Sequence, residues 1–231
     1  MNIAVLLSGG IGSRLNLDTP KQYISINDEM IVTTTLGGLL QNALVDVVWI
    51  VSYEKWKDII LSEANERYES LTYKIKGFSS PGANRQLSIY NALLDISKIA
   101  ADEDAILIQD AARPLTHEST ITGCLTKIEG HDGALPVLPM KDTIYMSEDG
   151  NAISSLLDRN KLFAGQAPEA YRYGKYKKAN EALLPDEILK INGAAEPAIL
   201  AGMDVVMFPG DEGNFKITTD ADLRKFKGLF S

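Results

Sequence analysis

The chain has 231 residues, of which 45% are hydrophobic and 23% are charged, so it is long enough to bury a substantial core. Its net charge of −8 argues against a general nucleic-acid binder, although it is compatible with a local basic pocket for a small phosphorylated ligand. The single cysteine, Cys124, excludes an intrachain disulfide and a cysteine-based zinc site, and the presence of only two histidines argues against a histidine-centred mechanism.

Five apolar runs rich in valine and isoleucine predict buried strands. They cover residues 3–7, 45–51, 105–109, 134–138 and 204–208. Runs as continuous as these are typical of strands that are buried on both faces of a mostly parallel sheet.

Segments with helical periodicity lie between the apolar runs. They cover residues 33–42, 53–68, 84–100, 118–128, 173–184 and 194–201. Thr219 is expected to cap a final helix, with Asp220 and Asp222 in its first turn. Alternating strands and helices predict an α/β fold with a three-layer, open, mostly parallel sheet, because there are too few units for a barrel. We expect a single domain over residues 1–231.

The segment of residues 140–165 interrupts this alternation. Two strand-like pieces flank the sequence Glu148-Asp149-Gly150-Asn151, which favours a hairpin turn. We therefore expect this segment to leave the core as a β-hairpin arm.

The chain begins directly with a short apolar run, and no apolar stretch approaches the roughly 20 residues that a membrane span requires. We expect a cytoplasmic protein that acts on a small molecule, without a membrane or nucleic-acid partner.

The stretch SGGIGSRLNLDTPKQY at residues 8–23 follows the first predicted strand. In an open α/β sheet, this position lies at the carboxyl edge, where ligands bind. A dinucleotide-binding pattern that includes Gly10 would require a third glycine at the position of Leu15, and the end of a Walker phosphate-binding loop is also missing. What remains is either a glycine loop that holds phosphate with Arg14 and Lys21, or a plain turn with two surface cations.

This stretch resembles the opening of the cytidylyltransferases that act on methylerythritol phosphate or ribitol phosphate, and its double glycine is closer to the ribitol-phosphate branch. Further blocks similar to this family follow in order: GANRQLSIYNAL (82–93), DAARP (110–114), KDT (141–143), DRN (158–160), GQAPEAY (165–171) and NFKITTDADL (214–223). The resemblance covers nearly the whole chain. It implies a Rossmann-like nucleotidyltransferase fold and a homodimer that exchanges its arms.

The resemblance also implies a Mg²⁺-dependent enzyme that joins CTP to a polyol phosphate, with ribitol 5-phosphate as the leading substrate. The substrate phosphate would attack the α-phosphorus of CTP and release pyrophosphate, without a covalent enzyme intermediate. Two alternatives stay open, namely methylerythritol phosphate as the substrate and a non-catalytic, nucleotide-binding regulator. Leu15 argues against a third alternative, an NAD-type oxidoreductase.

The family resemblance assigns the catalytic roles to Arg14 and Lys21, whose charges suit a triphosphate and its transition state. Asp110 ends a predicted strand and is the expected Mg²⁺ ligand, with a salt bridge to Arg113 as the structural alternative. Arg159 on the arm is expected to reach the substrate phosphate of the partner. The complete set of expected substrate-binding residues is Gly9, Gly10, Gly12, Gly82, Ala83, Asn84, Arg85, Ser88, Asp110, Ala111, Arg113, Asp142, Thr143, Arg159, Gln166 and Lys216.

The chain departs from the family pattern at two places. Ala83-Asn84 stands where an acidic residue is frequent, and Asn192-Gly193 stands where Thr-Asp is usual. Losing a carboxylate changes the pattern of hydroxyl groups that a pocket can hold, and Glu196 is a candidate replacement one turn later. The identity of the polyol is therefore open at the level of sequence.

Overall fold

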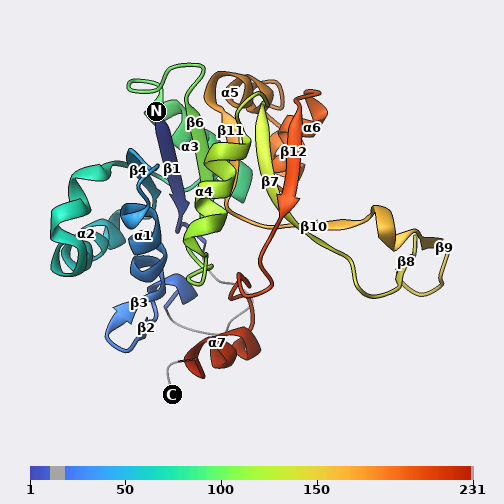
Figure 1. The fold of residues 1–231 in the computed structure, drawn as a ribbon, viewed down its shortest axis with the longest axis horizontal. Helices are drawn as coiled ribbons and strands as arrows, with labels where there is room; N and C mark the ends of the chain where they lie inside the picture. Colours follow the sequence, from blue (N-terminus) through green and yellow to red (C-terminus); the bar gives the residue numbers. More distant parts are fainter. Residues whose placement is uncertain (11–18, 230–231) are drawn as a thin grey trace.

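The computed structural model of the protein describes residues 1–10 and 19–229. Its centre is an eight-stranded sheet (Figure 1). The strands are β1 (Asn2–Leu7), β4 (Val47–Val51), β5 (Ile75–Ser79), β6 (Ala105–Asp110), β7 (Gly133–Pro139), β10 (Phe163–Gly165), β11 (Glu169–Arg172) and β12 (Val205–Pro209). They follow the order β10-β7-β11-β6-β1-β4-β5, and β12 also pairs with β7. The strands predicted from the five apolar runs are confirmed.

Most of the strand pairs are parallel. Ile3 of β1 lies opposite both Val47 and Ile106, and the pairs β4–β5 and β7–β12 are parallel too. The short strands β10 and β11 run antiparallel to their neighbours, and β11 lies between β6 and β7. The predicted mostly parallel sheet is confirmed, with this antiparallel insertion as an addition.

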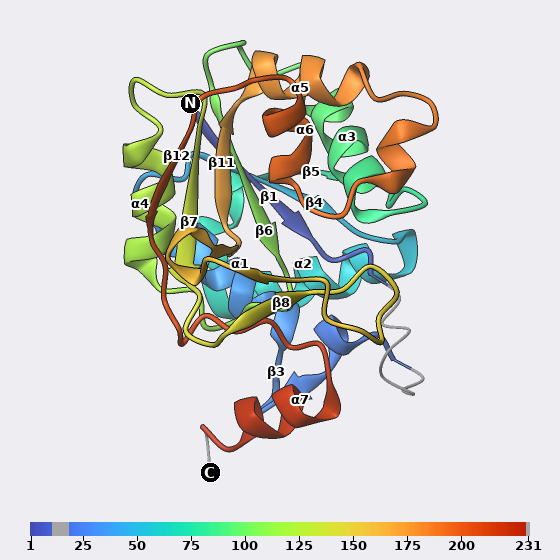
Figure 2. The same ribbon diagram turned by 90° about the vertical axis from the view of Figure 1, so that its right-hand side faces the viewer.

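Helices cover both faces of the sheet and form the outer two of the three layers (Figures 1 and 2). One face carries α1 (Ile31–Gln41), α2 (Glu54–Tyr68) and α4 (Glu118–Lys127), and the other carries α3 (Arg85–Ile96), α5 (Tyr173–Glu181) and α6 (Ala195–Leu200). None of the helices among the described residues is long and apolar enough to cross a membrane.

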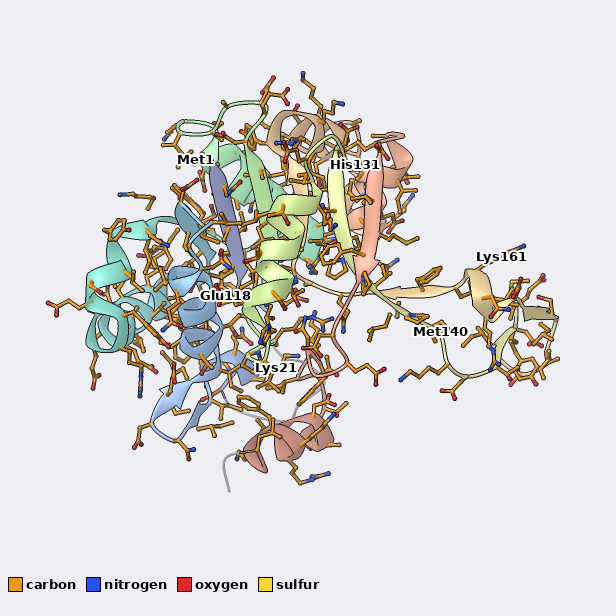
Figure 3. All side chains as sticks on the ribbon, in the orientation of Figure 1. Met1, Lys21, Glu118, His131, Met140 and Lys161 are labelled. Carbon is orange, nitrogen blue, oxygen red and sulfur yellow. The ribbon has the colours of Figure 1, made fainter. Side chains whose placement is uncertain are left out.

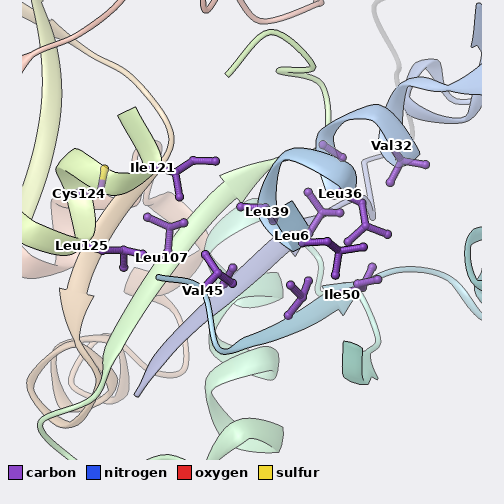
Figure 4. Packing of buried hydrophobic residues seen from close by; sticks show 14 of the residues in the cluster. Leu6, Val32, Leu36, Leu39, Val45, Ile50, Leu107, Ile121, Cys124 and Leu125 are labelled. Carbon is purple, nitrogen blue, oxygen red and sulfur yellow. The ribbon is translucent and has the colours of Figure 1, made fainter. Parts of the chain in front are cut away.

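The two faces of the sheet explain the unbroken apolar runs. In β1, Ala4 and Leu6 pack into the core beneath α1, whereas Ile3 and Val5 pack into the core beneath α3. Figure 4 shows the first of these cores, where Leu36 of α1 packs near Leu6. Because both faces of the strand are buried, a polar residue at any of these positions would lose its hydration.

Short elements complete the end of the sheet at which β1 and β6 terminate: η1 (Lys21–Tyr23), β2 (Ser25–Ile26), β3 (Glu29–Met30) and α7 (Asp220–Lys227). Two further short helices are η2 (Glu69–Lys74) and η4 (Glu187–Lys190). Leu223 and Phe226 of α7 pack against Ile31 and Ile217 in a small separate core. The predicted cap at Thr219 is confirmed, because its side chain and that of Asp222 form a reciprocal capping box.

The segment around residues 140–165 leaves the body as an arm, as predicted (Figures 1 and 3). It carries β8 (Ile144–Met146), β9 (Ser155–Leu157) and η3 (Arg159–Lys161). The connection between the two strands is longer than the tight turn predicted, because residues 147–154 lie outside both strands. Asp149 organises this connection by accepting hydrogen bonds of 2.9 Å from the N–H groups of Asn151 and Ala152. The role of the arm in dimer formation stays a prediction.

Candidate active site

A cavity of about 710 Å³ lies where the central parallel strands end. Leu7, Val51 and Asp110, the last residues of β1, β4 and β6, all line it. Open α/β sheets bind their ligands at this carboxyl edge, because the loops that follow the strands converge there. Many of the expected site residues also line the cavity: Gly9, Gly10, Lys21, Gly82, Ala83, Asn84, Arg85, Ser88, Asp110 and Lys216.

The glycine stretch at the start of the cavity is held by side chains of η1. Gln22 Nε2 donates hydrogen bonds of 2.6 Å to the carbonyl oxygens of Ser8 and Gly10, and Tyr23 Oη donates to that of Ser8 at 3.0 Å. A Cβ on Gly9 would come within 2.5 Å of Cγ of Pro81. The backbone of this loop is therefore fixed beside the cavity, and Gly9 has no room for a side chain.

The two remaining expected residues of this loop, Gly12 and Arg14, lie outside the described residues. Lys21, the other expected catalytic residue, lies at the first position of η1 and lines the cavity. Sequence reasoning missed Gln22, which belongs to the same PKQY block, lines the cavity and holds the backbone of the glycine stretch.

The loop before α3 forms another wall of the cavity. Ser88 Oγ accepts a hydrogen bond of 2.9 Å from the N–H of Gly82 and donates one of 2.8 Å to the carbonyl of Asn84. Asn84 caps α3 by accepting from the N–H of Leu87 at 2.8 Å, and it donates to the carbonyl of Ile188 at 2.9 Å. Both side chains therefore hold the loop in shape. Their predicted contacts with substrate stay predictions.

Asp110 is the only acidic residue among the described residues that line the cavity, and three cations surround it. Lys216 Nζ lies 2.8 Å from Oδ2, Arg85 Nε lies 3.1 Å from Oδ1, and Arg113 Nε lies 3.8 Å from Oδ2. Burial alone would raise the pKa of Asp110, but Arg85, Lys216 and Arg113 outweigh it and hold that pKa well below its usual range. Asp110 is therefore a permanent carboxylate at neutral pH.

A second carboxylate, Glu169 at the start of β11, lies behind Arg85 and outside the cavity wall. Its Oε1 is 3.6 Å from Arg85 Nη2, and its Oε2 accepts a hydrogen bond of 2.6 Å from Tyr171 Oη. Burial raises the pKa of Glu169 above its ordinary value, despite the opposing effect of Arg85. Glu169 was not among the expected site residues, because a single charged residue in a short segment usually indicates a surface position.

Three other expected residues do not line the cavity. Ala111 is buried, and Arg113 Nη1 donates to the carbonyl of Asn214 at 2.6 Å. Gln166 donates to the carbonyl of Asp211 at 2.8 Å and accepts from the N–H of the same residue at 3.0 Å. The predicted substrate contacts of all three stay predictions.

The expected residues of the arm are not brought to the cavity of their own chain. Asp142, Thr143 and Arg159 are all exposed, and Arg159 Nη1 donates to the carbonyl of Lys141 at 2.9 Å. Figure 3 shows the arm, marked by Lys161, pointing away from the body that contains Lys21. A contribution of the arm to catalysis therefore requires a second subunit.

The segment that departs from the family pattern has a local structural role. Glu196 accepts a hydrogen bond of 3.0 Å from the N–H of Asn192, so its carboxylate holds the start of α6 and is not among the groups that line the cavity. A Cβ on Gly193 would meet no atom within 4 Å. The position at which an acid is usual is therefore open space.

Besides Gln22, five residues of the cavity were not expected from the sequence. Tyr53 is 41% exposed and lies directly before α2, while Leu7, Val51, Ala112 and Thr218 complete the lining. An aromatic residue before a helix carries no pattern that separates a ligand contact from an ordinary surface position. The cavity thus combines uncharged lining residues, Tyr53 and Gly82 among them, with charged ones, Asp110 and Lys216 among them.

The sequence and the fold are similar to those of known cytidylyltransferases. The profile of the family described as IspD, 2-C-methyl-D-erythritol 4-phosphate cytidylyltransferase, matches residues 2–228. A ribitol-5-phosphate cytidylyltransferase of Lacticaseibacillus paracasei is 28% identical over 229 residues, which cover 98% of this chain and 97% of the relative. A second ribitol-5-phosphate cytidylyltransferase, of Streptococcus agalactiae serotype III, is 30% identical over 235 residues, which cover 100% of this chain and 95% of the relative.

Relatives with the other substrate name match about equally well. A 2-C-methyl-D-erythritol 4-phosphate cytidylyltransferase of Clostridium beijerinckii is 31% identical, with 95% of this chain and 94% of the relative covered. The fold is shared with a solved 4-diphosphocytidyl-2C-methyl-D-erythritol synthase from Anaerococcus prevotii, at a TM-score of 0.82, 19% identity and coverage of 99% and 95%. The corresponding Francisella tularensis structure gives a TM-score of 0.79 at 24% identity, with 99% of both chains covered.

Proposed function

Because this chain belongs to the IspD family of cytidylyltransferases and is thus a nucleotidyltransferase, we propose that it joins CTP to ribitol 5-phosphate and releases pyrophosphate. The observation that supports this most is the composition of the cavity. Fixed loop backbone lies at Gly9, Gly10 and Gly82, and the cations Lys21 and Lys216 line the same space. Such a combination suits a nucleotide, whose base needs little charge and whose phosphates need much.

The nucleotide is proposed to lie along the two loops. The cytosine would meet the backbone of Gly82 and Ala83 and the exposed ring of Tyr53, three lining residues that carry no charge. The triphosphate would lie along Gly9 and Gly10 with Lys21, since exposed backbone N–H groups and a cation both favour phosphate oxygens.

The polyol phosphate is proposed to bind beside Asp110 and Lys216. Its phosphate oxygen would attack the α-phosphorus of CTP, the bond between the α- and β-phosphates would break, and pyrophosphate would carry away the electron pair. Lys21 and Lys216 would stabilise the negative charge that the transition state spreads over the phosphate oxygens. Arg14 is expected to share this role and lies outside the described residues.

A triphosphate normally binds together with Mg²⁺, and the donor set can be tested for it. No group of three or more His, Cys, Asp or Glu side chains in residues 1–10 and 19–229 could hold a metal ion by itself. Mg²⁺ that is bound to substrate phosphates needs only one or two carboxylates, and Asp110 is a permanent carboxylate that lines the cavity. The residues therefore fit a Mg²⁺ ion that takes Asp110 as a single protein ligand, and the ion would neutralise phosphate charge.

The choice of ribitol 5-phosphate rests on fewer observations than the choice of CTP. The double glycine Gly9-Gly10 supports it, and so do the relatives of that name, which match nearly the full chain. Relatives named for 2-C-methyl-D-erythritol 4-phosphate are equally similar, so this compound is the second candidate. Gly193 stands where a carboxylate was expected, and a Cβ there would meet no atom within 4 Å. The loss of this carboxylate fits a site whose contacts with substrate hydroxyl groups have been altered.

The arm supports a homodimer as part of the proposal. Tyr145, Met146, Ile153 and Leu156 expose 56%, 43%, 66% and 66% of their surface on an element that stands away from the body (Figure 1). Apolar side chains concentrated on a projecting hairpin would be covered by a second copy, and Arg159 would then enter the cavity of the partner.

The proposed reaction can be tested by pyrophosphate release from CTP, Mg²⁺ and a polyol phosphate. The proposal requires release to depend on both substrates and to yield an equal amount of CDP-polyol. Tight CTP binding without turnover on ribitol 5-phosphate or 2-C-methyl-D-erythritol 4-phosphate would instead support the non-catalytic, nucleotide-binding alternative.

A further inference from the structure

Glu169 is a buried charged group that the proposed chemistry leaves without a function. It is 6% exposed, and it does not line the cavity. A carboxylate costs free energy when it leaves water, unless cations and hydrogen-bond donors replace its hydration. Glu169 has one of each, Arg85 at 3.6 Å and Tyr171 at 2.6 Å. These partners suggest a charge that is retained for a purpose other than packing.

Arg85 links Glu169 to the cavity. Its Nε bonds Oδ1 of Asp110 at 3.1 Å, while its Nη2 faces Glu169, so two carboxylates hold two edges of one guanidinium group. The guanidinium is planar and its donors have fixed directions, so contacts on two edges determine the orientation of the whole group. The same carboxylate presents its other oxygen, Oδ2, to Lys216 at 2.8 Å, so Arg85 and Lys216 contact the two oxygens of Asp110.

We propose that Glu169 is a positioning residue, which holds Arg85 in the orientation that fixes Asp110 and Lys216 at the phosphate end of the cavity. This role rests on the cytidylyltransferase function proposed above. The charges of the cluster support this role. The three cations Arg85, Arg113 and Lys216 pair with the two carboxylates Asp110 and Glu169. Neutralising Glu169 would leave this cluster with one more positive charge and Arg85 with a single carboxylate partner.

The groups around Glu169 determine when it loses its charge. Burial raises the pKa of Glu169 and Asp110 raises it further, whereas Arg85, Tyr171 and Arg113 lower it, and the net pKa lies above that of an ordinary glutamate. Cys124 of α4 and Tyr176 of α5 also face this charge, and burial first and the proximity of Glu169 second raise the pKa of each. The charge of Glu169 is therefore lost at a higher pH than that of an exposed glutamate.

The variant Glu169→Gln tests the role directly, because it keeps the size of the side chain and an acceptor for Tyr171 but removes the charge. At a pH at which Glu169 is ionised, we expect kcat/KM for ribitol 5-phosphate to fall at least about tenfold, as is usual when a residue that orients a ligand-binding side chain is lost. The Kd for CTP measured without Mg²⁺ should stay close to that of the wild type, because the proposed nucleotide contacts that need no metal ion do not involve Glu169.

The pH dependence separates positioning from a structural effect. As the pH falls, the wild-type Glu169 becomes protonated and resembles glutamine, so the ratio of variant to wild-type rate should rise towards one. Taking this ratio cancels the titration of the substrate phosphate, which both proteins share. A ratio that stays constant over the range in which both proteins remain folded would overturn the role of Glu169.

Two further variants make the test decisive. Glu63→Gln removes another partly buried carboxylate, which accepts from Met30 N–H at 2.7 Å and pairs with Arg67 away from the cavity, and it should leave the rate unchanged. Tyr171→Phe removes a donor that lowers the pKa of Glu169, so the decrease in rate at acidic pH should begin at a higher pH.

If Glu169→Gln fails to fold, the pH profile of Tyr171→Phe tests the role instead. A decrease at the same pH as in the wild type would contradict the proposal. Absent wild-type turnover would remove the proposed function as well, whereas an active wild type with a constant ratio removes only the role of Glu169.

Discussion

Lys216 Nζ lies 2.8 Å from Oδ2 of Asp110, and this ion pair forms the charged wall of the cavity. The lysine side chain keeps 35% of its surface exposed, while the aspartate side chain keeps only 10%. Asp110 therefore lies deep and fixes the direction of Lys216, and the ammonium group remains accessible to a phosphate. A lysine that is held in this way loses less freedom when it binds its ligand.

Replacing Lys216 by alanine should reduce turnover strongly. The variant removes a cation that is proposed to stabilise transition-state charge, so we expect kcat to fall by about 10²–10³, the usual effect of losing one such group. Steady-state pyrophosphate release measures this. Lys190→Ala is a matched control, because its exposed ammonium pairs with Glu187 and does not line the cavity. Equal rates for the two variants would contradict the proposed role of Lys216.

Replacing Ser88 by alanine should weaken CTP binding without affecting the polyol phosphate. The N–H of Gly82 would lose its acceptor and the loop its anchor, and an unsatisfied, partly buried donor costs about 1 kcal/mol. Calorimetric titration with CTP would measure the loss, which we expect to be about fivefold in Kd. Ser97→Ala is the control, since that hydroxyl donates to the carbonyl of Leu94 at the far end of the same helix. If both variants bind CTP like the wild type, Ser88 does not hold the loop for the nucleotide.

The arm can be tested by mixing two inactive subunits. Arg159→Ala keeps an intact cavity and loses the arm arginine, while Lys21→Ala keeps an intact arm and loses a cation of the cavity. If the arm crosses to the partner, a mixed dimer combines one intact cavity with one intact arm and recovers roughly half of the wild-type activity. The two subunits should be co-expressed with different tags and purified through both. Activity no higher than that of the parent variants would show that Arg159 does not act across the dimer.

The capping box of α7 predicts a pH-dependent contribution to stability. Burial alone would raise the pKa of Asp222, but the N–H and hydroxyl groups of Thr218 and Thr219 lower it to about 2. Its folded pKa is therefore below the unfolded value of about 3.9, so its contribution is complete above pH 4 and is lost as the pH falls towards 2.

We expect Asp222→Asn to lower the free energy of unfolding by about 1 kcal/mol at neutral pH, as is typical when a helix cap is lost. Denaturant titrations of both proteins from neutral to acidic pH would measure the difference, which should shrink between pH 4 and 2. A difference that does not depend on pH would show that the charge of Asp222 is not what stabilises the cap.

Much of the fold follows from local patterns in the sequence. The central strands are buried on both faces, so their apolar runs are unbroken, and the helices between them carry clear periodicity. The strands β5 and β11 escape this reasoning, because IKGFS and EAYR are short and contain charged residues. Glu169 can start a buried strand only because Arg85 and Tyr171 pair with it, and sequence spacing does not reveal such long-range pairs.

Sequence reasoning predicted those site residues that follow a strand or precede a helix. Asp110 and the glycines of the two loops lie at such positions, which open α/β sheets bring together at one edge. Tyr53 and Thr218 carry no comparable signal and emerge only when the strands are placed side by side. Ser88 and Asn84 were expected as ligand contacts, yet their hydrogen bonds to the loop depend on backbone geometry that no motif encodes.

The most direct test compares kcat/KM for ribitol 5-phosphate and for 2-C-methyl-D-erythritol 4-phosphate, with CTP and Mg²⁺ at saturation and pyrophosphate release as the signal. The proposed function predicts turnover with ribitol 5-phosphate, formation of CDP-ribitol in equal amount, and a clearly lower value for the second substrate. Turnover of 2-C-methyl-D-erythritol 4-phosphate alone would contradict the proposed polyol, and no turnover with either compound would contradict the proposed reaction.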